Sequence, residues 1–171
     1  IFSNTDLIVT VSDNGRNYLQ QKYPVFKNKI KLSRLGVFDN GLNPYTSGDT
    51  FHIISVSNLV PLKRVDLIFE CLQHSSVNIV WHHFGDGPLK DQLNERVKTA
   101  REGLKVVMHG FVDNKSLMVF YKTQSLDLFI NLSTSEGLPV SIMEALSFGV
   151  PVFATNVGGT SELVKDNLGK L

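Results

Sequence analysis

Short apolar runs alternate with amphipathic stretches from residue 52 onward. Five runs rich in apolar and β-branched residues are predicted strands, at residues 52–57, 77–84, 105–109, 127–132 and 151–155. Between the runs, apolar side chains recur every three or four residues, as on the helix predicted from Pro61 with Val65, Ile68, Phe69 and Leu72 on one face. This alternation predicts βαβ units, an α/β fold and a parallel sheet. Because the runs are apolar throughout, we expect helices on both faces of the sheet.

The first 38 residues form a separate pattern. They predict a strand at 6–12, a helix at 14–23 and a second strand at 29–35. A stretch rich in Asn, Gly, Pro and Ser follows at residues 39–51 and predicts a linker. Helix starts are expected at Pro88 and Pro139, and helix caps at Asp113 and at Thr160 or Ser161.

Composition narrows the class of protein. Of the 171 residues, 42% are apolar and 19% charged, which is typical of a soluble globular domain. The net charge of +1 gives no basic field for nucleic acid, and no apolar run approaches the roughly 18 residues of a membrane span. The single cysteine, Cys71, lies in an apolar helical pattern and is predicted to be buried, which fits a reducing cytoplasm. Neither end has the features of a natural terminus, so we expect a piece of a longer protein.

The densest candidate chemistry follows the fourth predicted strand. Glu136 lies in the loop, and Gly137 would let another backbone approach closely. Pro139 opens a helix whose free N–H groups and dipole would attract an anion, and Glu144 lies further along that helix. Two carboxylates and a helix N-terminus suit the hydroxyls and phosphates of a sugar nucleotide. The spacing alone leaves open that Glu144 is an ordinary solvated residue.

These residues and several other motifs resemble the retaining glycosyltransferase family 4, of the GT-B class with two Rossmann-like domains. The segment from Glu136 to Glu144 matches the family's E-x7-E motif. The resemblance continues in order over nearly the whole chain, through residues 57–63, 85–88, 109–112, 149–152 and 157–162. It implies that residues 1–38 are a remnant of the N-terminal acceptor domain and residues 39–51 a linker. Residues 52–171 would be the C-terminal nucleotide-sugar-binding domain, truncated at its end.

The resemblance also implies roles for individual residues. Glu136 would contact the donor sugar, Glu144 the ribose and Lys63 the diphosphate, so that Glu136 and Lys63 are the catalytic candidates. The other implied donor contacts are Gly137, Leu138, Pro139, Gly110, Phe111 and Val112, the last three at the nucleobase edge. Many family members have Arg at the position of Asn58 and Gly at that of Arg64. Whether Arg64 replaces the missing cation stays open.

The implied activity is retaining transfer of a hexose from a nucleoside diphosphate sugar to a glycan or lipid-linked acceptor. No cofactor and no metal are implied, and the chain has no D-x-D triplet. We expect a cytoplasmic enzyme without a nucleic-acid partner, compatible with peripheral membrane association at the inner face through the missing domain. The isolated chain is expected to be inactive. A nucleotide-sugar epimerase of the same architecture and a non-catalytic nucleotide-sugar-binding module are the alternatives.

Overall fold

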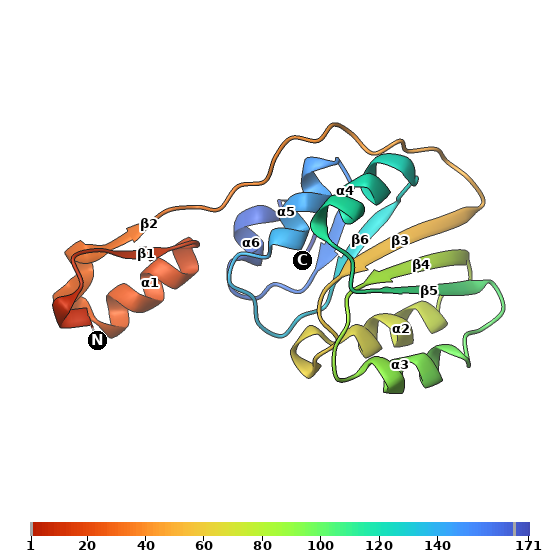
Figure 1. The fold of residues 1–171 in the computed structure, drawn as a ribbon, viewed down its shortest axis with the longest axis horizontal. Coiled ribbons are helices and arrows are strands. Elements are labelled where there is room, and N and C mark those ends of the chain that lie inside the picture. Colours follow the sequence, from red (N-terminus) through yellow and green to blue (C-terminus); the bar gives the residue numbers. More distant parts are fainter. Residues whose placement is uncertain (1, 166) are drawn as a thin grey trace.

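The computed structural model describes residues 2–165 and 167–171, which form two units joined by an extended linker (Figure 1). The small unit, residues 2–35, has two short parallel strands and one α-helix. Its elements are η1 (Phe2–Asn4), β1 (Ile8–Thr10), α1 (Asp13–Lys22), η2 (Pro24–Lys29) and β2 (Ile30–Leu32). Ser12 caps α1 by accepting a hydrogen bond from the Gly15 N–H.

The large unit, residues 50–171, is an α/β domain with a six-stranded parallel sheet in the order β5-β4-β3-β6-β7-β8. Its strands are β3 (Thr50–Val56), β4 (Asn78–Phe84), β5 (Leu104–Gly110), β6 (Leu128–Asn131), β7 (Val152–Ala154) and β8 (Gly169–Lys170). Its helices are η3 (Pro61–Lys63), α2 (Val65–Gln73), α3 (Lys90–Val97), α4 (Asn114–Thr123), α5 (Val140–Ser147) and α6 (Thr160–Leu163). The predicted Rossmann-like parallel sheet is confirmed.

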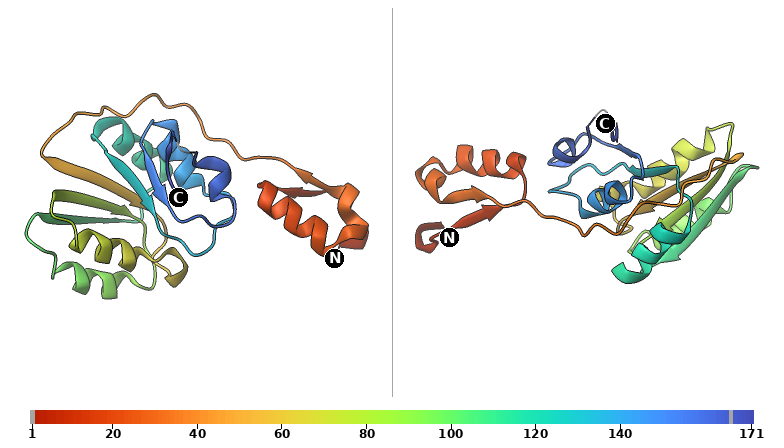
Figure 2. Two further views of the ribbon diagram at one scale, coloured as in Figure 1. Left: turned by 180° about the vertical axis from the view of Figure 1, so that it is seen from behind. Right: turned by 90° about the horizontal axis from the view of Figure 1, so that it is seen from above.

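Two hydrophobic cores lie on opposite faces of this sheet. Along β3, Ile54 enters the core that α4 and α5 cover, while Ile53 enters the core under α2 and α3. Phe129 and Ile130 divide in the same way on β6. Figure 2 shows these helices on both sides of the sheet. The strands are therefore apolar at successive positions because both faces are buried.

The strand order reverses between β3 and β6. The chain builds outward from β3 to β4 and β5, then returns to the other side of β3 for β6, β7 and β8. In open parallel sheets of this kind, ligands bind outside the carboxyl ends of the strands at such a reversal. The loops that follow β3 and β6 are therefore the first places to look for a site.

Several predicted boundaries are wrong in detail. No single helix runs on from Pro61, because Pro61–Lys63 form a 3-10 turn and α2 begins only at Val65. Pro88 lies in the turn that leads into α3, which begins at Lys90. The cap of α6 is Gly159 and neither Thr160 nor Ser161. Asp113 does cap α4, by accepting a hydrogen bond from the Ser116 N–H.

Cys71 is exposed, contrary to its predicted burial. Successive helical residues point about 100° apart, so a residue between two buried positions need not be buried itself. The buried side chains of α2 are Val65, Ile68, Phe69 and Leu72.

The linker is held against the large unit by Asn43. Its side-chain Nδ2 donates to the carbonyls of Tyr121, at 2.6 Å, and Gln124, at 2.7 Å. Its Oδ1 accepts from the Leu126 N–H at 3.0 Å. β3 begins at Thr50, inside the stretch predicted as linker.

Candidate functional site

An ion pair between Lys63 and Glu136 lies at the reversal of strand order. Lys63 ends the 3-10 turn after β3, and Glu136 lies in the loop after β6. Lys63 Nζ donates to Glu136 Oε1 at 2.7 Å, and the two side chains are 23% and 9% exposed. Asn131, the last residue of β6, donates to the same oxygen at 3.2 Å. The two predicted catalytic residues are therefore in direct contact.

The ionisation of Glu136 reflects two opposing effects. Burial acts to raise its pKa, but hydrogen bonds led by the one from Lys63 outweigh burial, and the pKa is lowered. Glu136 is therefore a carboxylate at neutral pH and neutralises Lys63 in the absence of a ligand. An anionic ligand that displaces Glu136 from Lys63 would leave the carboxylate free to accept hydrogen bonds.

The loop from Glu136 to Pro139 is packed tightly against the glycines after β7. Gly158 has a φ of +54°, and a Cβ there would lie 1.7 Å from the Glu136 carbonyl oxygen. The Gly159 N–H donates to the Gly137 carbonyl at 2.8 Å. The close approach predicted at Gly137 therefore exists, but the glycines it requires are Gly158 and Gly159, since a Cβ on Gly137 would meet nothing within 4 Å.

Glu144 lies on α5, which begins after Pro139. The residue is 9% exposed, and its Oε1 accepts from Asn114 Nδ2 at 2.7 Å. Burial raises the pKa of Glu144, while the hydrogen bond from Asn114 opposes that rise. A cavity of about 180 Å³ opens beside it, lined by Gly36, Val37, Phe38, Asn40, Asn114, Met118, Val140, Glu144 and Ser147. Neither Lys63 nor Glu136 is among the residues that line this cavity.

Arg64 has an unusual backbone. Its φ of 49° and ψ of 41° place it in the left-handed region, where it is the one residue other than glycine with positive φ in the described part of the chain. Bulky side chains in this conformation raise the energy of the backbone, and such strain is concentrated at functional sites. Within residues 2–165 and 167–171, the Arg64 side chain makes no hydrogen bond or ion pair. A cation without a partner therefore lies beside the paired Lys63.

The loop after β5 and the loop after β3 share a third cavity, of about 160 Å³. Its lining comprises Val56, Ser57, Asn58, Phe84, Gly85, Phe111, Val112 and Leu117. The structure thus brings together Asn58, Phe111 and Val112, which the sequence separates by more than fifty positions. The Phe111 ring is 81% exposed. Gly110 ends β5 with a φ of +70° and turns the chain into this loop.

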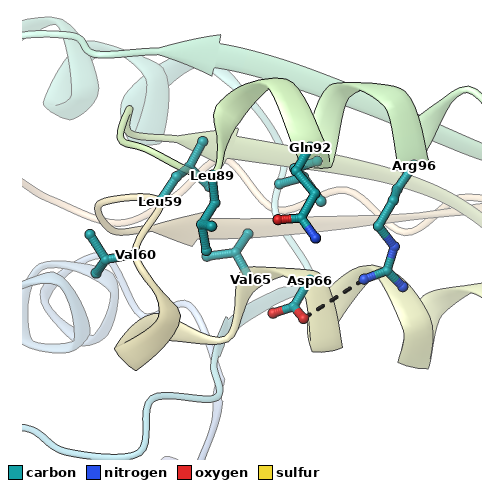
Figure 3. A pocket seen from close by; sticks show the side chains of 8 residues that line it. Leu59, Val60, Val65, Asp66, Leu89, Gln92 and Arg96 are labelled. Carbon is teal, nitrogen blue, oxygen red and sulfur yellow. Dashed lines mark ion pairs between the residues drawn. The ribbon is translucent and has the colours of Figure 1, made fainter.

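Two further cavities carry less of this chemistry. One of about 40 Å³ lies between α2 and α3 (Figure 3). Its lining includes the apolar residues Leu59, Val65 and Leu89 and the Asp66–Arg96 ion pair, whose charged atoms are 3.7 Å apart. This volume suits a water molecule or two. Another cavity, of about 440 Å³, lies at the amino ends of β3, β6 and β7, whereas the Lys63–Glu136 ion pair lies beyond the carboxyl ends of the strands.

No group of three or more His, Cys, Asp and Glu residues in the described part of the chain is arranged to hold a metal ion. No described helix is long and apolar enough to cross a membrane.

Comparison with known families decides what this arrangement belongs to. Residues 44–170 match the family model described as glycosyl transferases group 1. The chain belongs to this glycosyltransferase family. One relative, the putative colanic acid biosynthesis glycosyltransferase WcaL of Escherichia coli K12, is 27% identical over 96% of the chain and 43% of WcaL. This glycosyltransferase chain therefore spans less than half the length of that relative.

Solved structures support the same fold for this glycosyltransferase chain. The apo form of the lipopolysaccharide outer core galactosyltransferase WaaB superposes with a TM-score of 0.83 at 20% identity, over 97% of the chain and 48% of WaaB. HepE of Anabaena in complex with UDP-glucose superposes with a TM-score of 0.77 at 20% identity, over 97% of the chain and 50% of HepE. At these identities the likeness shows the GT-B type of Rossmann-like fold and no more.

The sequence motifs did not indicate the contacts of three polar side chains, Asn131, Asn114 and Glu162. Asn131 binds Glu136, and Asn114 binds Glu144. Glu162 accepts hydrogen bonds from the small unit, at the Asp13 and Asn14 N–H groups, both at 2.9 Å. The position of Asn114 directly after the helix cap Asp113 was a usable signal for its fixed orientation. Nothing local in the sequence indicated the partners of Glu162.

Proposed function

We propose that the large unit binds the nucleoside diphosphate sugar of a retaining glycosyltransferase. The carrying observation is the Lys63–Glu136 ion pair at the strand-order reversal, with the N-terminus of α5 next in the chain and Glu144 on that helix. The proposed reaction transfers a hexose to a glycan or lipid-linked acceptor. Support comes from the family match and from relatives whose names describe glycosyl transfer.

In the proposed mechanism Lys63 binds the donor diphosphate. Negative charge grows on this leaving group as the glycosidic bond breaks. The Lys63 ammonium and the first-turn N–H groups of α5 stabilise that charge. Binding of the diphosphate to Lys63 releases Glu136, whose carboxylate then accepts hydrogen bonds from the sugar hydroxyls.

The remaining roles follow from position. Glu144 accepts hydrogen bonds from the ribose hydroxyls, and Arg64 supplies the second cation that Asn58 lacks. Gly137, Leu138 and Pro139 shape the loop beside the sugar. The backbone of Gly110, Phe111 and Val112 borders the nucleobase in the cavity beside Asn58. In retention, the acceptor attacks the face that the diphosphate leaves, and a leaving-group oxygen takes the acceptor proton.

The proposal extends to the setting of the enzyme. Donor binding needs no divalent metal, so we expect EDTA to leave it unchanged. The acceptor site and any contact with the inner face of the membrane are assigned to the rest of the N-terminal domain, in a cytoplasmic protein. We therefore expect no transfer by the 171-residue chain alone, because the proposed acceptor site lies outside it. Turnover above a control without enzyme would contradict this expectation.

Calorimetry with UDP and UDP-glucose, with GDP and ADP sugars in parallel, tests the assignment. Lys63→Ala is expected to weaken diphosphate binding by roughly 1.5–3 kcal/mol, the range for a charge-assisted hydrogen bond. Glu144→Ala should weaken it comparably through the ribose. Glu136→Ala should not weaken binding of the bare diphosphate, because it frees Lys63, but should abolish the preference for the sugar-bearing form.

Lys98→Ala is the matched control, since Lys98 forms an exposed pair with Glu95 on α3. It should leave binding of every ligand unchanged. Equal losses of diphosphate binding in Glu136→Ala and Glu144→Ala would show that the two carboxylate roles are wrongly assigned. Product analysis of the full-length protein separates transfer from epimerisation and from binding without chemistry.

A further inference from the structure

Glu144 is a carboxylate that pairs with no cation in the part of the chain that the structure describes. The residue is 9% exposed, and the cavity beside it is lined by no other charged side chain. From α4, the titratable group that the charge of Glu144 affects is the hydroxyl of the fully buried Tyr121, whose pKa is raised first by burial and then by that charge. From the linker and from α5, the cavity is lined by uncharged side chains. The charge of Glu144 therefore depends on uncharged donors.

Asn114 is the donor that the fold supplies. Its amide Nδ2 lies 2.7 Å from Glu144 Oε1. Asn114 is the first residue of α4, and the Asp113 cap anchors that helix start through the Ser116 N–H at 3.0 Å. The amide is thus presented from a fixed helix end, directly after the loop of residues 110–112. A neutral amide stabilises the carboxylate and leaves its negative charge in place. A lysine at the same position would cancel that charge.

We propose that Asn114 is a positioning residue that keeps Glu144 ionised and turned so that Glu144 Oε2 is presented to the ribose hydroxyls of the nucleotide. This inference rests on the proposed role of Glu144. It adds that Asn114, at the start of α4, determines how selectively the Glu144 carboxylate accepts hydrogen bonds from hydroxyl groups. The hydrogen bond occupies Glu144 Oε1, and among the described residues no side chain donates to Oε2.

The test uses Asn114→Ala and Asn114→Asp, with Lys115→Ala as the control at the next, exposed position. The first readout is the carboxyl ¹³C titration of Glu144 by NMR in the ligand-free chain. We expect the titration midpoint to move upward in Asn114→Ala, and further in Asn114→Asp, where a second carboxylate repels the first. Lys115→Ala should leave the titration unchanged. An unchanged midpoint in both Asn114 variants would overturn the inference without any nucleotide.

The second readout is the affinity for UDP, GDP or ADP, whichever binds the unmodified chain most tightly, between about pH 5.5 and 8.5. Asn114→Ala should lose on the order of tenfold at the acidic end, because a charge-assisted hydrogen bond is removed. It should recover part of that loss at the alkaline end, where Glu144 ionises without help. An equal loss of affinity at every pH, or no loss of affinity, would overturn the proposal that Asn114 keeps Glu144 ionised. If no diphosphate binds the unmodified chain, the proposed function fails, and the titration still decides the inference about Asn114.

Discussion

The small and large units are stabilised by different kinds of contact. In the large unit, apolar side chains from the sheet and helices fill two cores. In the small unit, Ile30 is the one buried hydrophobic residue among those the structure describes, and Leu7, Val9 and Val25 are between 52% and 88% exposed. Two short strands and a helix bury too little surface to be stable alone. The stability of the chain therefore resides in the large unit.

Polar contacts hold the small unit in place. The Glu162 carboxylate on α6 accepts hydrogen bonds from the first turn of α1, at Asp13 and Asn14, and from Arg34. A carboxylate at a helix N-terminus is favourable because it meets free N–H groups and the positive end of the dipole. This docking is electrostatic, whereas the folding of the large unit is driven by apolar burial. The following predictions test that difference, beginning with the largest effect.

Phe129→Ala is expected to lower the free energy of unfolding of the large unit by about 3–5 kcal/mol, since it empties a fully buried ring from the core. The single tryptophan, Trp81, is buried in the large unit, so its fluorescence during urea unfolding reports on that unit alone. Ile30→Ala in the small unit is the matched variant and should leave the Trp81 transition nearly unchanged. Similar losses in both variants would mean that the two units fold as one.

Acid should weaken the large unit selectively, because it contains all five histidines. The pKa of His82 is lowered from 6.5 to about 4 by burial and then by the neighbouring His109, whose ring is hydrogen-bonded to it at 3.0 Å. The unfolded chain therefore takes up a proton near pH 6.5 while the folded chain does not, so stability falls as the pH drops from 6.5 to 4. After allowance for the half-exposed site, we expect a loss of about 1–2 kcal/mol.

Urea unfolding at pH 7.5 and pH 5, followed by Trp81 fluorescence, measures this loss. His82→Phe should reduce the loss, since the new ring keeps the packing against His109 and Phe120 but takes up no proton. An identical pH dependence in the variant would show that other groups govern the acid sensitivity.

Glu162→Gln should loosen the small unit by about 1 kcal/mol, the usual contribution of a side chain that caps a helix N-terminus. Hydrogen exchange at the Asp13 and Asn14 amides should accelerate about fivefold, while the Trp81 transition stays unchanged. Burial opposes ionisation of Glu162, but its hydrogen bonds prevail and lower its pKa. The contact is therefore complete above the ordinary pKa of a carboxyl and is lost as the pH falls. Glu95→Gln, in an exposed pair on α3, is the control.

Arg64→Gly should produce the smallest change in stability, and it should stabilise the protein where the other variants destabilise it. Glycine adopts the left-handed conformation without strain, so the large unit should gain somewhat less than 1 kcal/mol. The same variant should weaken nucleoside diphosphate binding if Arg64 is the second cation. A gain in stability without any loss of binding would show that Arg64 does not contact the diphosphate.

The sequence predicted the large unit well because its physical signal is local. Ile53 and Ile54 side by side, with Phe129 and Ile130 in the same pattern, indicate strands buried on both faces. The E-x7-E motif likewise located Glu136 and Glu144 on a loop and the helix after it. Predictions were weaker where distant residues decide the outcome. The two-residue strand β8 depends on pairing with β7, and Glu162 contacts residues about 150 positions earlier.

Arg64, directly after η3, shows a second limit of sequence analysis. The family resemblance places Gly at position 64 in many members, and the left-handed backbone there explains that preference. The arginine in this chain gave no sign of strain, because nothing in a side chain's identity reports the backbone angle imposed by the turn before it. The Asn114–Glu144 contact was hidden for a related reason, since it joins two helices whose relative positions only packing determines.

The single linker between the units also has a consequence for inheritance. The candidate site residues from Asn58 to Glu144 all follow the linker in the chain, and linker residues 36–40 contribute to the cavity beside Glu144. A genetic crossover just before residue 36 would carry these residues, with that part of the cavity lining, into another protein. The recipient would need a surface to meet Glu162, since that carboxylate is what the large unit offers to the unit before it. Exchange of the first part of the gene would therefore leave the Lys63–Glu136 pair at the strand-order reversal unchanged.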